Sequence, residues 1–272
     1  MNERYGWRFG VVLAGTWMVL MFLLLPIFVS APISLTPERF LTLPKDHITF
    51  RNYENLVTNP NWTSSIGQSL IVATVSTIIA TTLGTLCAIG LWRIASRWSE
   101  LVRGFVLLPM IVPSIVSALA FYRIFVDLHL LDSYPGIILA HTVLSVPYVV
   151  ITVSTSLANF DLRLEQAARN LGADLKQTLW MVILPCIAPG VLAGAVFAFI
   201  QSWDEIVVTL FITKLNIFTL PRRMWDGIRD QADPTIAACA TTLIFLTILV
   251  IGSQMWLRYR RLKAQSRAED AA

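Results

Sequence analysis

Two adjacent carboxylates, Asp204 and Glu205, are the residues of this chain best suited to chemistry, and they stand in the apolar stretch QSWDEIVV. If this stretch crosses a membrane, each acid costs about 2.5–3.5 kcal/mol on insertion scales, so such acids usually face a cavity or a partner. Neighbours on a helix point about 100° apart, so the pair would line a path for a cation rather than chelate one ion. Two structural interpretations stay open: an ion pair with Arg123 or Lys214, and a hydrated position near the membrane surface.

A helical face leads to these acids. Residues three or four apart on a helix lie on one side, which groups the acids with a run of small and polar residues: Gly190, Gly194, Ala198, Gln201 and Glu205. Asp204 stands beside this face. The functional interpretation is an acidic lining for a cationic solute.

A second stretch, LEQAARNLGADLKQTLWMVILP at 164–185, is charged although apolar runs flank it. Its apolar residues recur at steps of three or four, which predicts an amphipathic helix over 160–171: Leu157, Phe160, Leu164, Ala168, Leu171 and Leu175. Gly172 suits a helix stop, and Asp174 suits the cap of a second short helix. Ala167 and Ala168 keep one face thin, so another protein could approach closely. The alternative is a helix lying on lipid.

Other chemistry finds little support in the sequence. His141 is isolated among apolar residues, which is typical of a packed, hydrogen-bonded histidine and not of a ligand. Cys87, Cys186 and Cys239 have no metal-ligand spacing. We therefore predict no metal site. The chain contains no G-x-x-x-x-G-K-[ST] phosphate loop, so it cannot bind ATP in the Walker manner. A membrane-embedded enzyme would need clustered acids, bases or nucleophiles at one depth, and the apolar runs lack such a cluster.

The elements that must position these groups are membrane spans. Hydrophobic residues make up 56% of the chain and charged residues only 14%, against about 25% charged in soluble domains. Apolar runs of ~18 residues or more are candidate spans, and six occur: 9–35, 64–92, 104–126, 134–158, 186–213 and 234–257. The first is too long for the core of a cleaved signal peptide. The net charge of +4 follows the loops and does not indicate nucleic acid; the expected surroundings are membrane lipid.

The positive residues orient these spans. With the N-terminus in the cytoplasm, the Lys and Arg residues inside would be Arg4, Arg8, Arg93, Arg97, Arg103, Arg163, Arg169, Lys176, Arg258, Arg260, Arg261, Lys263 and Arg267. Those outside would be the smaller set Arg39, Lys45, Arg51, Arg123, Lys214, Arg222, Arg223 and Arg229. Cytoplasmic loops carry the excess of Lys and Arg, so both termini are predicted inside. Residues 159–185 then form a cytoplasmic loop between spans four and five.

Features within the spans predict bends and close packing. Pro109, Pro113 and Pro147 each remove a helix hydrogen bond and favour a kink. The second span carries a stripe of small residues about four apart, where a neighbouring helix can approach closely: Ser69, Ala73, Thr77, Ala80, Gly84 and Ala88. The neighbour could belong to this chain or to another subunit.

The stretch at 164–185 resembles the conserved cytoplasmic loop of binding-protein-dependent ABC importer permeases, Glu-Ala-Ala, three residues, Gly, nine residues, Ile, one residue, Leu-Pro. The matching positions are Gln166, Ala167, Ala168, Gly172, Val182, Leu184 and Pro185. Gln166 replaces the family's Glu, with Glu165 one step earlier, and Val182 replaces Ile.

The likeness covers nearly the whole chain. ITFRNYENLVTNPNW with GQSLIVA, LANFDLRLEQAARNLGA, SWDEIVV and TLPRRMWDGIRDQADPTIAACATTLI are similar to the spermidine/putrescine-type branch. Permeases of this branch carry paired acids where Asp204 and Glu205 stand. Some also carry an acid where this chain has Ser114. The resemblance implies a small amino-containing solute: a polyamine or related cation, an opine or an aminophosphonate.

The resemblance also implies an architecture and a set of partners. Residues 1–272 would be one all-α transmembrane domain in the bacterial inner membrane. It would be a transport subunit and not an enzyme, because a separate cytoplasmic ATPase dimer would bind ATP and Mg and dock on residues 160–175. A second permease subunit, expected to differ from this one, and a periplasmic solute-binding protein would complete the complex. The binding protein would touch loops 36–63 and 214–233, with Arg222 and Arg223 as candidate contacts.

The resemblance and the pattern together give two sets of site residues. The ATPase-coupling set is Leu164, Glu165, Gln166, Ala167, Ala168, Leu171, Gly172, Leu184 and Pro185. The substrate-pathway set is Gln201, Trp203, Asp204, Glu205 and Ser114. A rival interpretation is an ion-coupled secondary carrier that uses Asp204 and Glu205 as its coupling site. Such carriers commonly show repeated halves, and this sequence has no convincing internal repeat.

Overall fold

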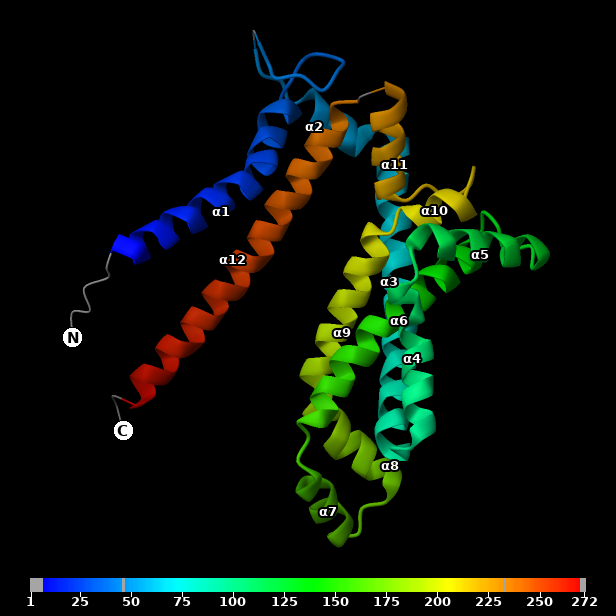
Figure 1. Cartoon of the computed structure of the whole chain (residues 1–272). Helices are drawn as coiled ribbons and strands as arrows, with labels where there is room; N and C mark the ends of the chain where they lie inside the picture. The colour runs from blue at the N-terminus through cyan, green and yellow to red at the C-terminus, as the bar shows by residue number, and fades with distance from the viewer. Residues whose placement is uncertain (1–6, 46, 232, 270–272) are drawn as a thin grey trace. The chain divides into compact units, whose positions relative to one another are not determined.

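The structure of the chain, a computed structural model, describes residues 7–45, 47–231 and 233–269. Over these residues it is helical and contains no β-strand (Figure 1), which confirms the predicted all-α class. Arg4, part of the predicted orientation signal, lies outside the described residues. The chain divides into two compact units, one from 1–63 and 224–272 and the other from 64–223.

Five helices are long and apolar enough to cross a membrane. They are Phe9–Ser34, Pro60–Ile94, Tyr134–Ala158, Leu175–Asp204 and Thr235–Arg260. A bent pair of helices, Arg97–Ile111 and Ser114–Asp127, adds a sixth crossing if the pair counts as one span. Each of these helices overlaps one of the predicted spans, and Tyr134–Ala158 coincides with the predicted 134–158.

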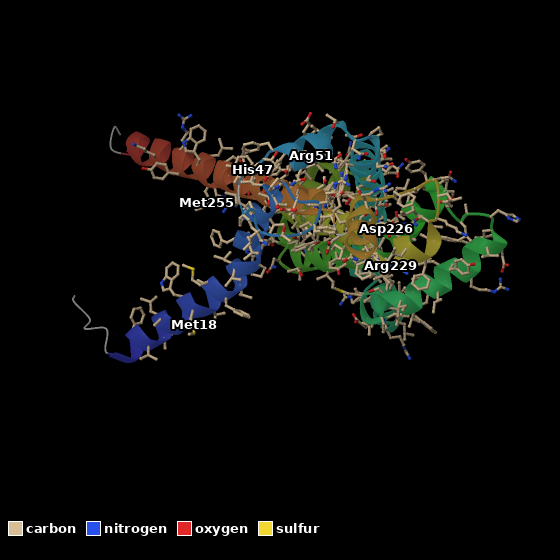
Figure 2. All side chains as sticks on the ribbon, turned by 90° about the horizontal axis from the view of Figure 1, so that it is seen from above. Met18, His47, Arg51, Asp226, Arg229 and Met255 are labelled. Atoms are coloured by element: carbon tan, nitrogen blue, oxygen red, sulfur yellow. The ribbon has the colours of Figure 1, made fainter. Side chains whose placement is uncertain are left out.

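The first unit consists of α1 (Trp7–Ser34), α2 (Arg51–Thr58), η2 (Gly227–Gln231) and α12 (Thr235–Glu269). The short helix α2 ties the end of α1 to the start of α12. The Asn52 side chain donates to the backbone oxygens of Ser34 and Thr36, 3.0 Å each, and Asn55 Nδ2 donates to Thr235 Oγ1 at 2.8 Å. From this junction α1 and α12 diverge, as Figures 1 and 2 both show.

Most of α1 has no covering element within its unit. Met18 is 77% exposed, and on α12 Met255 is 67% exposed; Figure 2 labels both on their separate helices. Within the window that qualifies α1 as a span, none of the residues is buried by the rest of the structure. Apolar side chains in this state need lipid or another chain around them, in agreement with a membrane-spanning role.

The second unit is built around α6 (Tyr134–Ala158), which packs on α9 (Leu184–Asp204) and on α3 (Pro60–Ile94). Small residues allow both approaches. A Cβ on Gly190 would stand 2.0 Å from Ser156 Oγ, and one on Gly84 would stand 2.7 Å from Val149 Cβ. The small-residue stripe predicted on the second span therefore meets α6 of the same chain.

The predicted third span, 104–126, is divided into two helices, and the division falls at Pro113, one of the predicted kinks. The structure has α4 (Arg97–Ile111) and α5 (Ser114–Asp127), which meet at 102°. Pro113 explains the break, because a proline disfavours helical backbone at the residue before it. Val112 accordingly has an extended conformation, with φ −70° and ψ 131°.

The predicted fifth span, 186–213, is displaced and broken. Its helical path begins at Leu175, because α8 (Leu175–Thr178) and a π-helical turn η1 (Leu179–Ile183) lead directly into α9. Pro185 lies in the first turn of α9. Beyond Asp204 the chain breaks at Glu205, whose ψ is 106°, and α10 (Val207–Ile212) follows.

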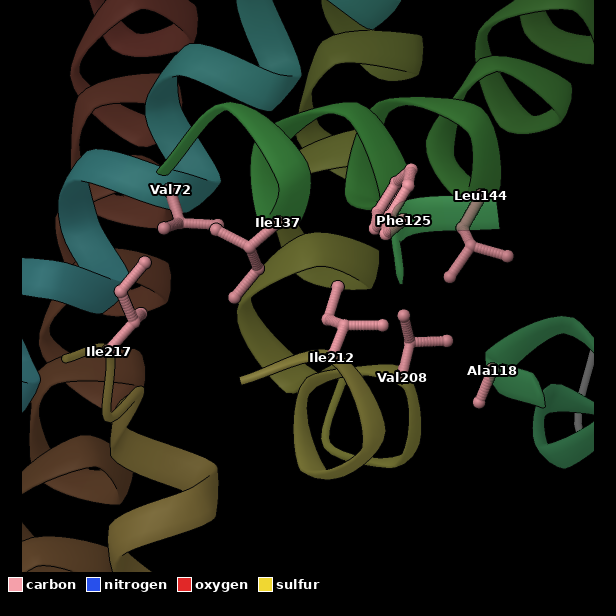
Figure 3. Close-up of a cluster of buried hydrophobic side chains, with 9 residues drawn as sticks. Val72, Ala118, Phe125, Ile137, Leu144, Val208, Ile212 and Ile217 are labelled. Carbon is pink, nitrogen blue, oxygen red and sulfur yellow. The ribbon is translucent and has the colours of Figure 1, made fainter. Parts of the chain in front are cut away.

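The two segments beyond these breaks, α5 and α10, pack on each other and on α6. Figure 3 shows their shared apolar cluster, in which Phe125 comes from α5, Val208 and Ile212 from α10, and Ile137 from α6. All four are at most 3% exposed. This packing explains how the short α10, only six residues long, keeps its place.

Candidate functional site

The segment between α6 and α9 contains the two short helices that the sequence predicts. Helix α7 (Leu162–Asn170) starts at Asp161, whose carboxylate accepts the Arg163 backbone N–H at 2.9 Å. It ends at Asn170, and Gly172 two residues later turns the chain with a φ of +88°. This left-handed conformation is one that glycine adopts at little cost, as at many helix ends.

The second short helix, α8, has a reciprocal cap. Asp174 Oδ1 accepts the Gln177 backbone N–H at 2.6 Å, and Gln177 Oε1 accepts the Asp174 backbone N–H at 3.0 Å. This is the capping-box arrangement, in which two otherwise unpaired donors are satisfied. The predicted cap at Asp174 and the predicted helix stop at Gly172 are both confirmed.

Glu165 is placed differently from the rest of the predicted coupling set. It is 6% exposed, and its Oε1 lies 2.7 Å from Arg93 at the end of α3 and 3.3 Å from Arg169 on α7. The Arg93 guanidinium also covers the Trp92 ring at 4.8 Å, and that ring meets Phe160 edge-on. Glu165 thus anchors α7 to α3. Sequence reasoning missed Arg93, since no spacing connects residues 93 and 165.

The other coupling residues mostly face outward. Leu164 is 47% exposed, Leu171 90% and Leu175 64%, and Leu162, which the sequence analysis did not select, is 55% exposed. Gln166, Ala167, Gly172 and Pro185 are also exposed, whereas Ala168 and Leu184 are half-buried. The predicted apolar stripe is therefore divided: Leu157 and Phe160 pack inward, and the leucines from 164 onward do not.

A hollow of about 380 Å³ lies beside the base of α7. It is lined by the end of α6, the start of α7 and the first turns of α9, with Phe160, Leu164 and Pro189 as its apolar walls. Of the exposed leucines, Leu164 lines this hollow. The apolar groups and the concavity of the hollow could receive side chains of another protein.

The acids of the predicted pathway have different surroundings. Glu205 is 8% exposed: its Oε1 accepts the Val208 backbone N–H at 2.9 Å, and its Oε2 accepts Gln201 Nε2 at 3.3 Å. Asp204 is exposed, and among the described residues none donates a hydrogen bond to its carboxylate. Arg123 does not pair with either acid, because it binds Asp127 at 2.8 Å.

The remaining pathway residues differ in exposure. Trp203 is half-buried and stacks on Phe199, with 5.8 Å between ring centroids, and Gln201 is half-buried. Ser114 is exposed at the first position of α5, directly after the bend at Pro113. The face of α9 that carries Gly190 and Ala198 is buried against α6, so it is a packing face and not a lining.

His141 stands close to these acids although the sequence offered no role for it beyond packing. It is 1% exposed, and its two ring nitrogens bind the hydroxyls of Ser202 and Thr209. The packed, hydrogen-bonded state that the sequence suggested for it is confirmed. In the described part of the chain no group of three or more His, Cys, Asp or Glu residues is arranged to hold a metal ion.

The loop after α10 is held by Asp132. Its carboxylate accepts backbone N–H groups of Lys214, Leu215 and Asn216 at 2.9–3.2 Å. Partial burial opposes ionisation of Asp132, but these donors and the Ile217 N–H outweigh it and lower the pKa below its ordinary value. Carboxylates that accept several backbone bonds behave in this way.

Arg222 is also part of this loop and is not the free contact that the sequence suggested. It is 9% exposed, and its guanidinium donates to Thr213 Oγ1 and to the Lys214 oxygen and covers the Phe218 ring at 4.2 Å. Arg223 is half-buried and donates to Ser65 Oγ at 3.3 Å. Both arginines serve the fold of the second unit.

Comparison with known proteins identifies the family of this chain. Residues 80–263 match the family described as binding-protein-dependent transport system inner membrane component. The spermidine/putrescine transport system permease protein PotC of Escherichia coli K12 is 31% identical over 252 residues, covering 92% of this chain and 95% of PotC. The putrescine transport system permease protein PotI of the same strain is 28% identical over 269 residues, covering 96% and 94%.

The fold has a solved counterpart as well. A chain from the crystal structure of a bacterial ABC transporter involved in the import of the acidic polysaccharide alginate matches with a TM-score of 0.70 at 17% identity, covering 95% of this chain and 99% of that one. The family match extends over more than half of the sequence and includes the α7 segment, the Asp204–Glu205 break and most of α12. This chain therefore belongs to the inner-membrane permease family of binding-protein-dependent ABC transporters, as a multi-pass protein of the bacterial inner membrane.

Proposed function

We propose that this chain is a permease subunit of an ATP-driven importer for a small amino-containing solute, either a polyamine or related cation, an opine or an aminophosphonate. A separate ATPase drives it by docking on residues 160–175. The family supports the permease role, and relatives named for spermidine and putrescine support an amino-containing solute. The observation that carries the docking proposal is the set of exposed leucines on an anchored α7.

Exposed leucines on a helix outside the bilayer require a cover. Leu171 is 90% exposed at the turn between α7 and α8, where neither helix can shield it. Each Å² of apolar surface removed from water contributes about 25 cal/mol, so covering several leucines makes the free energy of binding a partner substantially more favourable. The ion pair of Glu165 with Arg93 holds α7 in place, and a helix that transmits force needs such an anchor.

The topology follows from this proposal. The chain crosses the membrane six times with both termini in the cytoplasm, α4 and α5 together making the third crossing. The α7–α8 segment then lies on the cytoplasmic side, where an ATPase dimer holding ATP and Mg can reach it. A second, different permease subunit covers apolar helix faces that this chain leaves exposed, and a periplasmic binding protein delivers the solute.

The outer side offers one concave surface for that delivery. A hollow of about 750 Å³ in the first unit is lined by residues 37–40, by α2 and by residues 233–235, with Glu38, Glu54 and Asp233 among its charged groups. It lies within the outer loops expected to touch the binding protein. Arg222 is withdrawn from this role because it is buried.

Transport proceeds by alternating access in this proposal. ATP-driven closure of the ATPase dimer pushes on α7 of each permease and opens the pathway outward, and the binding protein then releases its solute. Asp204 and Ser114 are the exposed members of the pathway set, and Trp203 is half-buried. A carboxylate and an indole ring both attract an ammonium group. The ion-coupled carrier is disfavoured because the family consists of binding-protein-dependent transport components.

The docking proposal is tested by co-purification of the complex. Leu171→Asp places a charge in the proposed contact without disturbing the fold, because the side chain is 90% exposed. We expect the tagged variant, extracted in mild detergent from its native membrane, to lose the ATPase and solute-stimulated ATP hydrolysis while keeping the second permease. Leu215→Asp, at a 77% exposed leucine on the loop after α10, is the control and should keep the ATPase.

Retention of the ATPase by Leu171→Asp would remove the docking claim and favour the lipid-bound helix. Uptake that persists in cells without any ATPase partner would restore the ion-coupled carrier. For the solute, uptake of labelled putrescine and spermidine is measured in cells expressing the complete transporter, and failure of every amine, opine and aminophosphonate would overturn the solute class.

A further inference from the structure

The break between α9 and α10 is spanned by a single buried ring. His141 Nδ1 lies 2.9 Å from Ser202 Oγ, which precedes the break, and His141 Nε2 lies 3.1 Å from Thr209 Oγ1, which follows it. His141 belongs to α6, the helix on which both α9 and α10 pack. The two arms of the break are thus fixed to one rigid element by side-chain hydrogen bonds.

The donors and acceptors at this site determine how the ring is used. Thr209 donates its hydroxyl hydrogen to the Glu205 backbone oxygen at 2.9 Å, so towards His141 its oxygen must accept. Nε2 of His141 therefore carries a hydrogen and donates it to Thr209. Ser202 can then donate to Nδ1, and a neutral ring satisfies every partner. The arrangement thus needs one side chain with a donor on one edge and an acceptor on the opposite edge, as a neutral histidine ring has.

The break fixed in this way sends the two adjacent acids in different directions. Glu205 turns inward, where its carboxylate caps α10 through the Val208 N–H and accepts a bond from Gln201. Asp204 is left exposed at the end of α9. It shares its helix face with Ile200 and Phe197, which are 55% and 50% exposed.

We propose that His141 is a positioning residue for solute recognition: by locking the break it commits Glu205 to the fold and leaves Asp204 as the one acid of the pair that contacts the solute's ammonium group. This rests on the proposed function in that the solute carries such a group. His141 acts only through Asp204, because it is buried and its ring is fully occupied by two hydroxyls. Of the two adjacent acids, only Asp204 therefore presents a charge to the solute.

The first experiment measures the geometry and needs no solute. In a chain whose Cys87, Cys186 and Cys239 are replaced by Ala, Asp204→Cys introduces a thiol at the exposed position. We expect a cationic methanethiosulfonate reagent to modify it in membranes of cells that express the complex. Adding His141→Leu removes both hydrogen bonds and should change the modification rate at least about fivefold, because the break is free to reorient. An unchanged rate overturns the proposal.

The matched control is Thr142→Val. Thr142 follows His141 in α6 and is 3% exposed, but its hydroxyl bonds the Ile138 oxygen of its own helix at 2.7 Å. It tests the effect of removing a buried hydroxyl from the same turn without touching the break, and it should leave the modification rate unchanged. Ser202→Ala and Thr209→Val, which each remove one of the two bonds, replace His141→Leu if that variant does not reach the membrane. Both should shift the rate in the same direction.

The second experiment measures transport by the complete transporter with its binding protein, using putrescine as the probe. Asp204→Asn should lower uptake per ATP hydrolysed by about tenfold, the scale of one lost charge-assisted hydrogen bond, while hydrolysis stimulated by the binding protein persists. His141→Leu should show the same uncoupling. Because His141 acts through Asp204, the double variant should be no worse than the worse single variant.

Additive losses in the double variant would mean that His141 supports transport by a route other than Asp204, and would overturn the proposal. So would loss of the second permease from Asp204→Asn preparations, since the acid's partner would then be a protein. If wild type takes up no amine, the solute class of the proposed function fails, while the thiol experiment still decides whether His141 sets the break. Asp204→Glu, which keeps the carboxylate, should keep the uptake of putrescine that Asp204→Asn loses.

Discussion

At the residue scale, several polar side chains of this chain act on backbone or on one another and are not open to a ligand. Glu165 anchors α7, Glu205 caps α10, and Asp132 holds the loop after α10. Each is an acid that a reader of the sequence would consider for binding or catalysis. Each has a partner that is distant in sequence or is a backbone group, so residue type alone does not separate these acids from Asp204.

The anchoring pair makes a prediction for stability. Arg93→Ala leaves the 6% exposed Glu165 with only Arg169, and buried pairs broken on one side lose about 3–5 kcal/mol. Since the Arg93 side chain is 34% exposed, solvent screening reduces the expected loss to about 1–3 kcal/mol. Thermal unfolding of the purified variant measures it. Arg123→Ala, in a pair whose members are 72% and 63% exposed, should change the midpoint little.

Asp132 makes a prediction for pH dependence. Its pKa is lowered in the folded chain from an ordinary value of 3.8, so its contribution to stability is complete above 3.8 and is lost as the pH falls through the folded-state value. We expect Asp132→Asn to unfold about 2–4 °C below wild type at pH 7, as for a loss near 1 kcal/mol. The gap should stay constant down to pH 5 and close below 3.8. A gap that widens on acidification would contradict the assignment.

At the element scale, helix breaks determine where the functional groups stand. The 102° bend at Pro113 places Ser114 at the start of a separate helix, and the break at Glu205 divides the acids. In the coupling segment, Gly172 at φ +88° separates α7 from α8. Proline and glycine signal two of these breaks in the sequence.

Gly172 makes a prediction at this scale. A Cβ at this position would meet no atom within 4 Å, so a substitution acts through backbone strain alone. Gly172→Ala should cost about 1–2 kcal/mol, the penalty of the left-handed conformation, and Gly172→Asn should cost less because Asn tolerates it. Gly104→Ala, in the helical backbone of α4 with the same open surroundings, should stabilise the chain instead. Thermal midpoints of the three variants check both signs.

The elements that the sequence predicts well are those whose signals lie within a few residues of them. The cap at Asp174 and the stop at Gly172 act within a few residues, so the sequence predicts the end of α7 and the start of α8 nearly as they are observed. The break at Glu205 has no proline or glycine. It depends on His141, which lies 61 and 68 positions from its two partners, and on the apolar cluster that receives α10. Such distant contacts cannot be inferred from hydropathy, which predicted one continuous span.

At the scale of the whole molecule, the chain is organised to work with partners. Its two units contain long helices whose apolar sides have no cover within the described residues, α1 most of all. The sequence lacks a Walker phosphate loop. We therefore expect the purified chain alone to release no phosphate from ATP above the level of an empty-membrane preparation, and phosphate release to appear when the ATPase partner is added back. Turnover by the chain alone would contradict the division of labour.

The π-helical turn η1 has a consequence for sequence length. A π-helical turn holds one residue more than an α-helical turn, so such turns behave as single-residue insertions. Deleting one residue from Leu179–Ile183 would turn this stretch into an ordinary α-helical turn, so the helix beyond it would keep its phase. Gly190 would then keep its contact with Ser156, and Asp204 would stay on the exposed side. A one-residue deletion within α9 itself would instead rotate everything beyond it by about 100°, one residue's share of a 3.6-residue turn. The coupling segment can therefore lose one residue at η1 without moving the acids, and a deletion there should be far less damaging to transport than a deletion in α9.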